Sequence, residues 1–434
     1  MFVCTAAVLL LLAPAPARAD WPEFRGPRGN GLATDPGDAK PLGLPLRWSE
    51  TENVKWKAPI PHCGWSTPVV VGGQVWLTTA TLDGKDFFAI SIDAETGRVR
   101  SSERLFHADD PEPLGNNVNG YASPSPVIEP GRVYVHFGSY GTACLDTATC
   151  KVLWERRDLA CRHYRGPGSS AILFEDLLVL TFDGVDVQYL VALDTKTGRT
   201  VWKTDRSTVW DDLDAQGKPT REGDFRKAFS TPLVIDAGGK SQMVSLGARA
   251  AFSYDPRTGR ELWKVRHAGH SSAPRPVFGH GLVFFTTGHG TTQLWAVRVD
   301  GQGDVTDSHV AWKADRGVPL TPSPLLVGDL LYMVSDNGTA TCLEAATGKQ
   351  VWRERIGGNY AASPVYADGR MYFFNQQGKA NVLKAGRALE VLATNTLEDG
   401  CMASPAVSGK GLFVRTKTHL YRIEAANAGE RSAP

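Results

Sequence analysis

Beyond its first nineteen residues, the 434-residue sequence lacks any apolar run long enough to cross a bilayer as a helix. It also lacks an excess of charge of one sign, since 47 Lys and Arg residues stand against 46 Asp and Glu residues. No long basic run occurs, so nothing favours binding to nucleic acid. Gly-x-Ser-x-Gly, phosphate-loop and zinc-protease motifs are missing too, which leaves hydrolase and nucleotide-binding functions without a starting residue.

The N-terminus has the features of a secretory signal peptide. Val8 to Leu12 form a short apolar core, and Ala17-Arg18-Ala19 is a small-x-small cleavage site. Such a segment is removed on export and is too short to anchor a protein in a bilayer. The alternative is a buried N-terminal strand. We expect residues 1–19 to be the signal peptide and the mature protein to be periplasmic or secreted.

The cysteines form no Cys-x-x-Cys metal or redox pair. Cys4 lies ahead of the apolar core, so we expect no lipid anchor on the mature N-terminus. An exported protein can form disulfides, and Cys144 and Cys150 would flank one hairpin as a possible pair. The alternative is a buried thiol, because Cys144 and Cys342 occupy the same repeat position. The cysteines after the signal peptide are Cys63, Cys144, Cys150, Cys161, Cys342 and Cys401.

A repeat runs through most of the chain. Its clearest endings, Ala192 to Trp202, Tyr254 to Trp263 and Leu343 to Trp352, share an acidic residue followed by Thr-Gly-x-x-x-Trp. Its beginnings place a small residue and usually a proline ahead of a short apolar stretch. Starts roughly 40 to 60 residues apart fall within the range of propeller blades. The starts are Pro68, Pro126, Ala171, Pro232, Pro276, Pro324, Pro364 and Pro405.

The repeat predicts an all-β, eight-bladed β-propeller with four antiparallel strands in each blade. The alternation of apolar and polar residues in Gly131 to His136 is typical of a strand, and 45 Gly and 27 Pro residues supply many turns. We expect the propeller over residues 44–424, after an N-terminal extension (20–43) and before a disordered tail (425–434).

The last repeat ends near Glu424 without a Thr-Gly-x-x-x-Trp ending, and Asn53 to Lys57 has the pattern of the missing strand. We therefore expect this N-terminal strand to complete the last blade, because closure removes an unpaired sheet edge. The repeated tryptophan is expected to pack on the Thr-Gly turn of the next blade rather than to stack on a ligand. Glycine there suits a positive φ, and the acidic residue caps the turn.

These endings resemble the tryptophan-docking motif of pyrroloquinoline-quinone (PQQ) repeat propellers, over about Trp48 to Glu424. The segment Trp21 to Pro27 followed by Gly31 resembles the lead-in of many bacterial PQQ-like repeat proteins. Two branches share the motif: quinoprotein dehydrogenases, and BamB-like lipoproteins that help to assemble outer-membrane barrels. The resemblance implies the fold and leaves the activity open.

The sequence departs from both branches. Quinoprotein dehydrogenases typically carry a disulfide between adjacent cysteines, and longer insertions with calcium ligands and a catalytic Asp; no two cysteines are adjacent here. No Cys-x-x-Cys-His haem site occurs either. BamB-like proteins usually carry a lipid on an N-terminal Cys, which the expected mature chain lacks.

Strand order predicts where a site would lie. The turns before strand one and between strands two and three emerge on one face, which also receives the insertions Phe106 to Gly120 and Ser207 to Lys227. We call it the insertion-bearing face; Gly301 to Ser308 falls on the opposite side. Insertions gathered on one face are typical of a binding surface. Candidates for a binding mouth there are His62, Trp65, Asn119, Tyr121, His163, Arg165, His270, Arg275, His289, Asn359 and Tyr360.

Arginine and aromatic residues at one mouth are able to hold an anion, a peptide or a planar ligand. The alternative is that these are ordinary loop residues with local hydrogen bonds. His267 and His270 have a metal-like spacing without a third ligand nearby in sequence. The Asp109-Asp110 and Asp211-Asp212 pairs suit solvated loops better than calcium. We therefore predict neither catalytic residues nor a metal site.

The sequence favours an exported, non-catalytic, monomeric propeller that acts as a protein- or ligand-binding scaffold in the cell envelope, without a cofactor. The alternative implied by the resemblance is a quinoprotein oxidoreductase that uses PQQ and calcium to oxidise alcohols or sugars. A carbohydrate- or peptide-binding propeller would differ from the first only in its ligand. A tryptophan floor with clustered carboxylates would favour PQQ, and a broad apolar rim would favour a protein partner.

Overall fold

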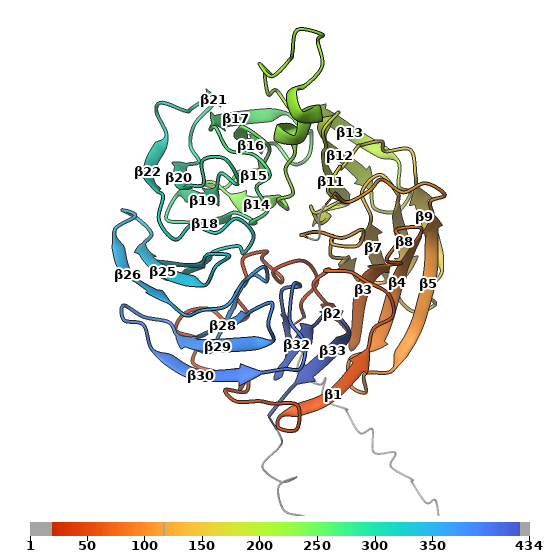
Figure 1. Ribbon diagram of the computed structural model, residues 1–434, viewed down its shortest axis with the longest axis vertical. Helices are drawn as coiled ribbons and strands as arrows, with labels where there is room; N and C mark the ends of the chain where they lie inside the picture. The colour runs from red at the N-terminus through yellow and green to blue at the C-terminus, as the bar shows by residue number, and fades with distance from the viewer. Residues whose placement is uncertain (1–19, 116–117, 426–434) are drawn as a thin grey trace, which may run out of the picture.

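The computed structural model describes residues 20–115 and 118–425 as eight sheets arranged radially around one axis (Figure 1). The predicted eight-bladed β-propeller is therefore confirmed. The predicted signal peptide and nearly all of the predicted tail lie outside the described residues. Within the part described, no helix is both long enough and apolar enough to span a membrane.

Each blade has four antiparallel strands, numbered from the axis outward in chain order except at the seam. Blade 1 has β2 (Val69–Val71), β3 (Gln74–Ala80), β4 (Asp86–Asp93) and β5 (Val99–His107). Blade 2 has β6 (Val127–Glu129), β7 (Arg132–His136), β8 (Thr142–Asp146) and β9 (Val152–Arg156). Blade 3 has β10 (Ile172–Phe174), β11 (Leu177–Asp183), β12 (Gln188–Asp194) and β13 (Thr200–Asp205). Blade 4 has β14 (Leu233–Asp236), β15 (Ser241–Leu246), β16 (Ala250–Tyr254) and β17 (Glu261–Arg266).

The second half of the ring repeats this order. Blade 5 has β18 (Val277–Gly279), β19 (Leu282–Thr286), β20 (Leu294–Arg298) and β22 (Val310–Ala314). Blade 6 has β23 (Leu325–Val327), β24 (Leu330–Val334), β25 (Thr339–Glu344) and β26 (Gln350–Arg355). Blade 7 has β27 (Val365–Ala367), β28 (Arg370–Phe374), β29 (Lys379–Lys384) and β30 (Val391–Thr396). Blade 8 has β31 (Ala406–Ser408), β32 (Gly411–Arg415), β33 (His419–Ile423) and β1 (Val54–Pro59).

The N-terminal strand closes the ring as predicted. β1 pairs antiparallel with β33, from Val54 opposite Ile423 to Pro59 opposite His419 (Figure 1). Blade 8 is thus built from both ends of the described chain. The pairing gives β33 a partner on the side where no other described strand pairs with it.

In five blades the repeated tryptophan docks onto the next blade, as predicted. The indole N–H of Trp56 donates to the carbonyl oxygen of Ala94 at 3.1 Å, and a Cβ atom on Gly97 would lie only 2.7 Å from the indole ring. Trp154 donates in the same way to the carbonyl of Thr195 at 2.9 Å. Further indole-to-carbonyl bonds of this kind come from Trp202, Trp312 and Trp352.

Trp263 departs from this arrangement because the next blade carries an insertion at the docking turn. Residues Gly301 to Ser308 replace that turn, and within them β21 (Gly303–Asp304) pairs with β17 in parallel as a fifth strand of blade 4. The Trp263 indole then donates to Gln242 of its own blade at 2.9 Å.

The predicted extension is part of the hub, the axial space bounded by the innermost strands. Trp21 pairs with Val70 of blade 1 through two backbone hydrogen bonds of 2.7 and 2.8 Å. On the far side of the ring, the Arg25 guanidinium donates to the carbonyl oxygens of Pro324 and Pro364, at 2.6 and 3.1 Å. Burial, followed by the nearby charge of Arg275, lowers the pKa of Arg25 to about 9. We call residues 20–34 the hub segment.

The possible Cys144–Cys150 disulfide is not formed, and all six cysteines of the described residues are free. Cys144 in β8 packs into the core between blades 2 and 3. Cys150, in the following turn at a φ of 60°, packs against the core between blades 1 and 2. The two thiols lie on opposite faces of the same blade, so a hairpin position alone does not bring them together.

Candidate functional site

Serine and threonine residues just ahead of the innermost strands form a ring around the hub. The backbone N–H of Thr67 donates to Ser125 Oγ, that of Ser125 to Ser170 Oγ, and that of Ser170 to Thr231 Oγ1, each at 2.9 Å. Because each blade donates to the next, the hydroxyls tie neighbouring blades together. The same 2.9 Å bond to the next hydroxyl continues around the hub from Arg275, Ser323 and Ser363. We call the hydroxyl ring Thr67, Ser125, Ser170, Thr231, Ser323, Ser363 and Ser404.

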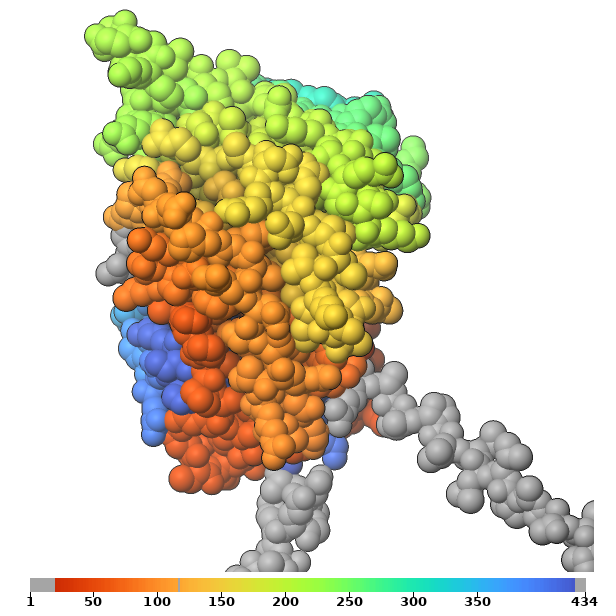
Figure 2. Space-filling view, turned by 90° about the vertical axis from the view of Figure 1, so that its right-hand side faces the viewer, coloured from red at the N-terminus to blue at the C-terminus, as the bar shows by residue number. Residues whose placement is uncertain are grey.

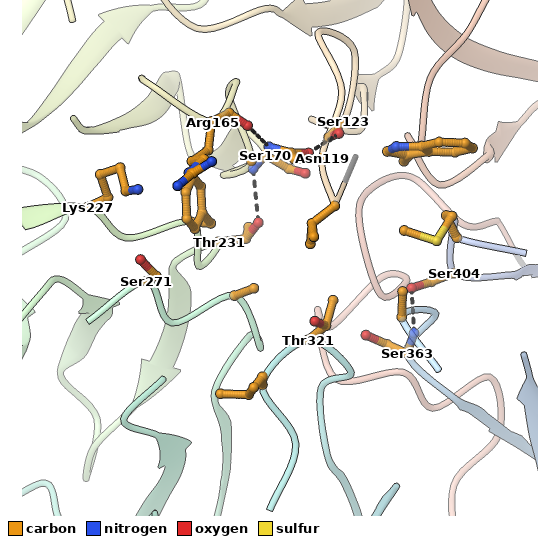
Figure 3. Close-up of a pocket in the computed structure, with 18 of the residues that line it drawn as sticks. Asn119, Ser123, Arg165, Ser170, Lys227, Thr231, Ser271, Thr321, Ser363 and Ser404 are labelled. Carbon is orange, nitrogen blue, oxygen red and sulfur yellow. Dashed lines mark hydrogen bonds between the residues drawn. The ribbon is translucent and has the colours of Figure 1, made fainter. Parts of the chain in front are cut away.

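A cavity of about 410 Å³ lies at the hub beside this ring (Figure 3). Its walls come from the loops of the insertion-bearing face, and Phe24 of the hub segment contributes to its lining. This volume lies in the range of small-molecule sites. Besides six hydroxyl-ring residues and Phe24, the hub cavity is lined by Trp65, Val118, Asn119, Ser123, Arg165, Asp224, Lys227, Phe229, His270, His289, Leu320, Thr321, Ala361 and Met402, among others.

One wall of the hub cavity carries the charge. Arg165 precedes β10 and Lys227 precedes β14, and both side chains lie on the same side of the cavity (Figure 3). Lys227 Nζ is hydrogen-bonded to Asp224, and Arg165 Nε lies 4.0 Å from the same carboxylate. The Lys227 side chain is only 3% exposed, and burial lowers its pKa although Asp224 opposes the shift. Two cations thus share one carboxylate.

Asp224 stays ionised despite its burial. Burial alone would raise its pKa, but the hydrogen bond and charge of Lys227, together with the charge of Arg165, hold the pKa below its ordinary value. The wall therefore keeps a net positive charge.

Two histidines meet at the rim of the cavity. The backbones of His270 and His289 exchange hydrogen bonds of 3.0 and 2.7 Å, and their rings are stacked at a centroid distance of 6.1 Å. Burial, followed by the charge of His289, lowers the pKa of His270 to about 4. The His270 imidazole is therefore neutral near pH 7, and it adds no cation to the wall.

Asn119 positions the loop that carries Arg165. Its side-chain amide N–H donates to the backbone carbonyls of Arg165, Gly166 and Pro167, at 2.9, 3.2 and 3.1 Å. Its side-chain oxygen accepts a hydrogen bond from the Ser123 hydroxyl at 2.5 Å. The side chain of Asn119 is therefore occupied by local bonds, as the loop-residue alternative anticipates.

Of the eleven predicted mouth residues, the structure brings five together in the hub cavity: Trp65, Asn119, Arg165, His270 and His289. Two others are buried beneath it. Arg275, 2% exposed, donates to Glu23 and to the carbonyl of Phe24, so it holds the hub segment. Tyr360 is fully buried and accepts a hydrogen bond from Asn381.

The remaining four predicted residues lie in neighbouring loops, each with a local partner. His163 is buried and accepts the backbone N–H of Ser139 at 3.0 Å. His62 stacks on Phe88 at 4.3 Å. Tyr121 donates to the carbonyl of Glu112, and Asn359 is exposed with its backbone N–H on Gln377.

Sequence reasoning missed most of the lining. Lys227 and Asp224 lie inside the second insertion, where nothing distinguished them from solvated loop residues. The hydroxyl ring did leave a signal, because Ser or Thr stands directly before the blade-starting residue in seven of the eight repeats, Arg275 being the exception. The repeat pattern defines that position only as a small residue.

The comparisons with known proteins agree with this architecture. A family model described as outer membrane protein assembly factor BamB matches residues 46–162 and 292–388. BamB of Burkholderia pseudomallei (strain K96243) is 34% identical over 130 residues, which cover 29% of this chain and 33% of that protein. The solved structure of BamB from Moraxella catarrhalis matches with a TM-score of 0.57 at 13% identity, over 85% of this chain and 99% of that chain.

The chain is a PQQ-like β-propeller repeat protein. BamB of Legionella pneumophila (strain Paris) is 22% identical over 205 residues, 45% of this chain and 50% of that protein. The match thus spans between a third and a half of the length of these curated relatives. A europium-containing methanol dehydrogenase matches with a TM-score of 0.54 at 11% identity, over 91% of this chain and 89% of that one. At such identities the structural matches show the fold alone.

The hub cavity of this PQQ-like propeller does not fit PQQ with calcium. Asp224 is the only carboxylate among the described lining residues, and it is already paired with Lys227. Calcium needs six or more oxygen ligands, usually from several carboxylates. The described residues contain no group of three or more His, Cys, Asp or Glu placed to hold a metal ion. We therefore derive no oxidation step through this cofactor.

Proposed function

We propose that this PQQ-like propeller is an exported, non-catalytic binding protein of the cell envelope that holds a protein partner on its insertion-bearing face. The main support for this proposal is the position of the large exposed apolar side chains. Ten occur in the described residues, and half are in loops of this face. The five are Leu82, Val118, Val187, Val209 and Leu213.

The other five exposed apolar side chains lie on the fourth strands, around the circumference. They are distributed over the outer strands of blades 1, 2, 3 and 7, with Val152 and Leu153 adjacent in β9, and exposed apolar side chains of this kind are ordinary on a protein surface. The apolar residues of the insertion-bearing face lie in its loops between blade 1 and blade 4, and two of them, Val209 and Leu213, belong to the second insertion. Large exposed apolar side chains that gather in the loops of one face are typical of a surface that binds another protein. The circumferential residues are Val99, Val152, Leu153, Val201 and Val391.

The second insertion projects from the ring as a hairpin (Figures 1 and 2). It contains the short 3-10 segment η1 (Thr220–Arg226). Its base is anchored, because Arg226 pairs with Asp212 at 2.5 Å and the Trp210 indole donates to Gln188 at 3.2 Å. Leu213 beyond this anchor is 57% exposed. An anchored apolar projection loses little conformational entropy when a partner covers it.

The relatives support a protein partner. Those matched in sequence are outer membrane protein assembly factors, and the proposal is that this chain likewise contributes to the assembly of outer-membrane proteins by binding another protein.

A photo-crosslinking amino acid placed at Leu82 or Leu213 tests this proposal in cells that make the protein naturally. Val201 and Val391 are matched controls, because they are 54% and 50% exposed but lie on outer strands. We expect a discrete adduct from the two face positions and none from the controls. Equal adducts at all four positions, or none at any, would contradict the proposal.

A further inference from the structure

The hub cavity is chemically polarised. Its cationic wall, Arg165 and Lys227, comes from the loops before blades 3 and 4, whereas Trp65 and Met402 come from the loops before blades 1 and 8. In Figure 3 Arg165 and Lys227 lie across the cavity from Ser404, the near neighbour of Met402 in sequence. Both cations therefore come from one side of the cavity, and Trp65 and Met402 supply apolar surface from another.

The Arg165 guanidinium of the cationic wall is held only loosely by the described residues, since it lies 4.0 Å from Asp224 and 4.8 Å from the centroid of the Tyr164 ring. The nearest carboxylate to Arg165 is that of Asp224, 4.0 Å from Nε, and this carboxylate is already hydrogen-bonded to Lys227. No other described residue forms an ion pair or a side-chain hydrogen bond with the Arg165 guanidinium. Its side chain is 25% exposed, so a ligand in the cavity can reach it. A partly desolvated guanidinium favours a carboxylate held through two parallel hydrogen bonds.

We infer that the hub cavity binds a small amphipathic carboxylate, with its acid group on Arg165 and its apolar group against Trp65 and Met402. The floor suits such a ligand, because Phe24 adds apolar surface and the hydroxyl ring offers polar contacts to the part between. A volume of about 410 Å³ admits one aromatic acid or the last residues of a peptide, but not a folded domain.

Two sources share this chemistry: a free amphipathic acid, and a peptide C-terminus with an apolar last residue. The inference deepens the proposed function, since the cavity opens on the same face, and it is tested separately, on the purified protein without any partner. Crosslinks at Leu213 without acid binding would remove only this inference. Acid binding without crosslinks would remove only the protein partner.

Calorimetric titration with 3-phenylpropionate and with acetyl-Gly-Gly-Leu tests the inference; 3-phenylpropanol and the peptide amide are the neutral controls. We expect at least one acid to bind at least tenfold more tightly than its neutral analogue, and binding to weaken as salt is added. Binding of the free acid alone would identify the ligand as a small acid. Binding of the peptide alone would identify it as the C-terminus of a chain. If neither acid binds at about 1 mM, or if the neutral analogues bind equally well, the inference is wrong.

Two substitutions in the same wall should act in opposite directions. Arg165→Gln removes the guanidinium and should weaken binding about 10- to 100-fold. Asp224→Asn removes the internal competitor and frees Lys227, so it should tighten binding. Arg162→Gln is the matched control, because Arg162 lies in the same loop, is 63% exposed and does not line the cavity. Equal affinities in the Arg165 and Arg162 variants, or weaker binding by Asp224→Asn, would overturn the inference.

Discussion

The contact that closes the ring gives the sharpest stability prediction. Gly97 has a φ of +73°, and a Cβ atom there would lie 2.7 to 3.0 Å from three ring atoms of Trp56. Gly97→Ala therefore adds two costs: about 1–2 kcal/mol for an alanine in a left-handed conformation, and about 1–3 kcal/mol for overpacking the indole. We expect the free energy of unfolding to fall by about 2–5 kcal/mol in urea denaturation followed by far-UV circular dichroism.

Gly73→Ala separates the two costs. Gly73 lies in the same blade at a φ of +80°, but a Cβ atom there would have nothing within 4 Å. Its substitution should cost only the backbone term, about 1–2 kcal/mol. In a Trp56→Ala background, Gly97→Ala should fall to the same cost, a coupling of about 1–3 kcal/mol. Equal losses from Gly97→Ala and Gly73→Ala in the parent protein would refute the docking contact at the seam.

Two further predictions concern acid and thiols. Burial lowers the pKa of His136 to about 3 and that of His163 to about 4, each with smaller charge effects. Below about pH 6.5 the unfolded chain therefore binds more protons than the folded chain does. Each histidine should lower the free energy of unfolding by about 2 kcal/mol between pH 8 and pH 5. Equal free energies of unfolding from urea denaturation at the two pH values would contradict this. For the thiols, mass spectrometry of unreduced protein should find Cys63 alkylated in the fold and all six cysteines of the described residues alkylated after unfolding, since Cys63 is the only one of the six that is exposed. Four or fewer labels on these six cysteines would indicate a disulfide.

The blade count and the ring closure were predictable because their determinants are local. Each repeat carries its own ending, and the Trp56–Gly97 contact is one more copy of the pair seen at Trp154 and Gly198. The last repeat lacks its fourth strand, and the N-terminal part of the chain carries a strand that belongs to no repeat. Pairing these two is the single way to complete the ring. The Gly301 to Ser308 insertion shows the limit, since its pairing as an extra strand on blade 4 required the fold.

The hub segment and the site could not be derived in the same way. Trp21 to Gly31 has no strand periodicity, and the carbonyls that receive Arg25 are about 300 residues away, at separations of 299 and 339. The direction of a loop side chain is also set by the turn around it. His163 and Arg165 are two residues apart in sequence, yet one is buried on Ser139 and the other lines the hub cavity.

Arg275 explains why one position of the hydroxyl ring differs from the rest. Where seven blades supply a hydroxyl, blade 5 supplies a guanidinium that reaches Glu23 and the backbone carbonyls of Phe24 and Pro232. The backbone N–H of Arg275 still donates to the Ser323 hydroxyl, so blade 5 keeps its bond to blade 6 although it offers no hydroxyl to blade 4. The exchange fixes the hub segment beneath the ring and sets Phe24 in the cavity lining. The segment therefore fills the hub and shapes the cavity, and a partner seated on the insertion-bearing face would lie directly over whatever that cavity holds.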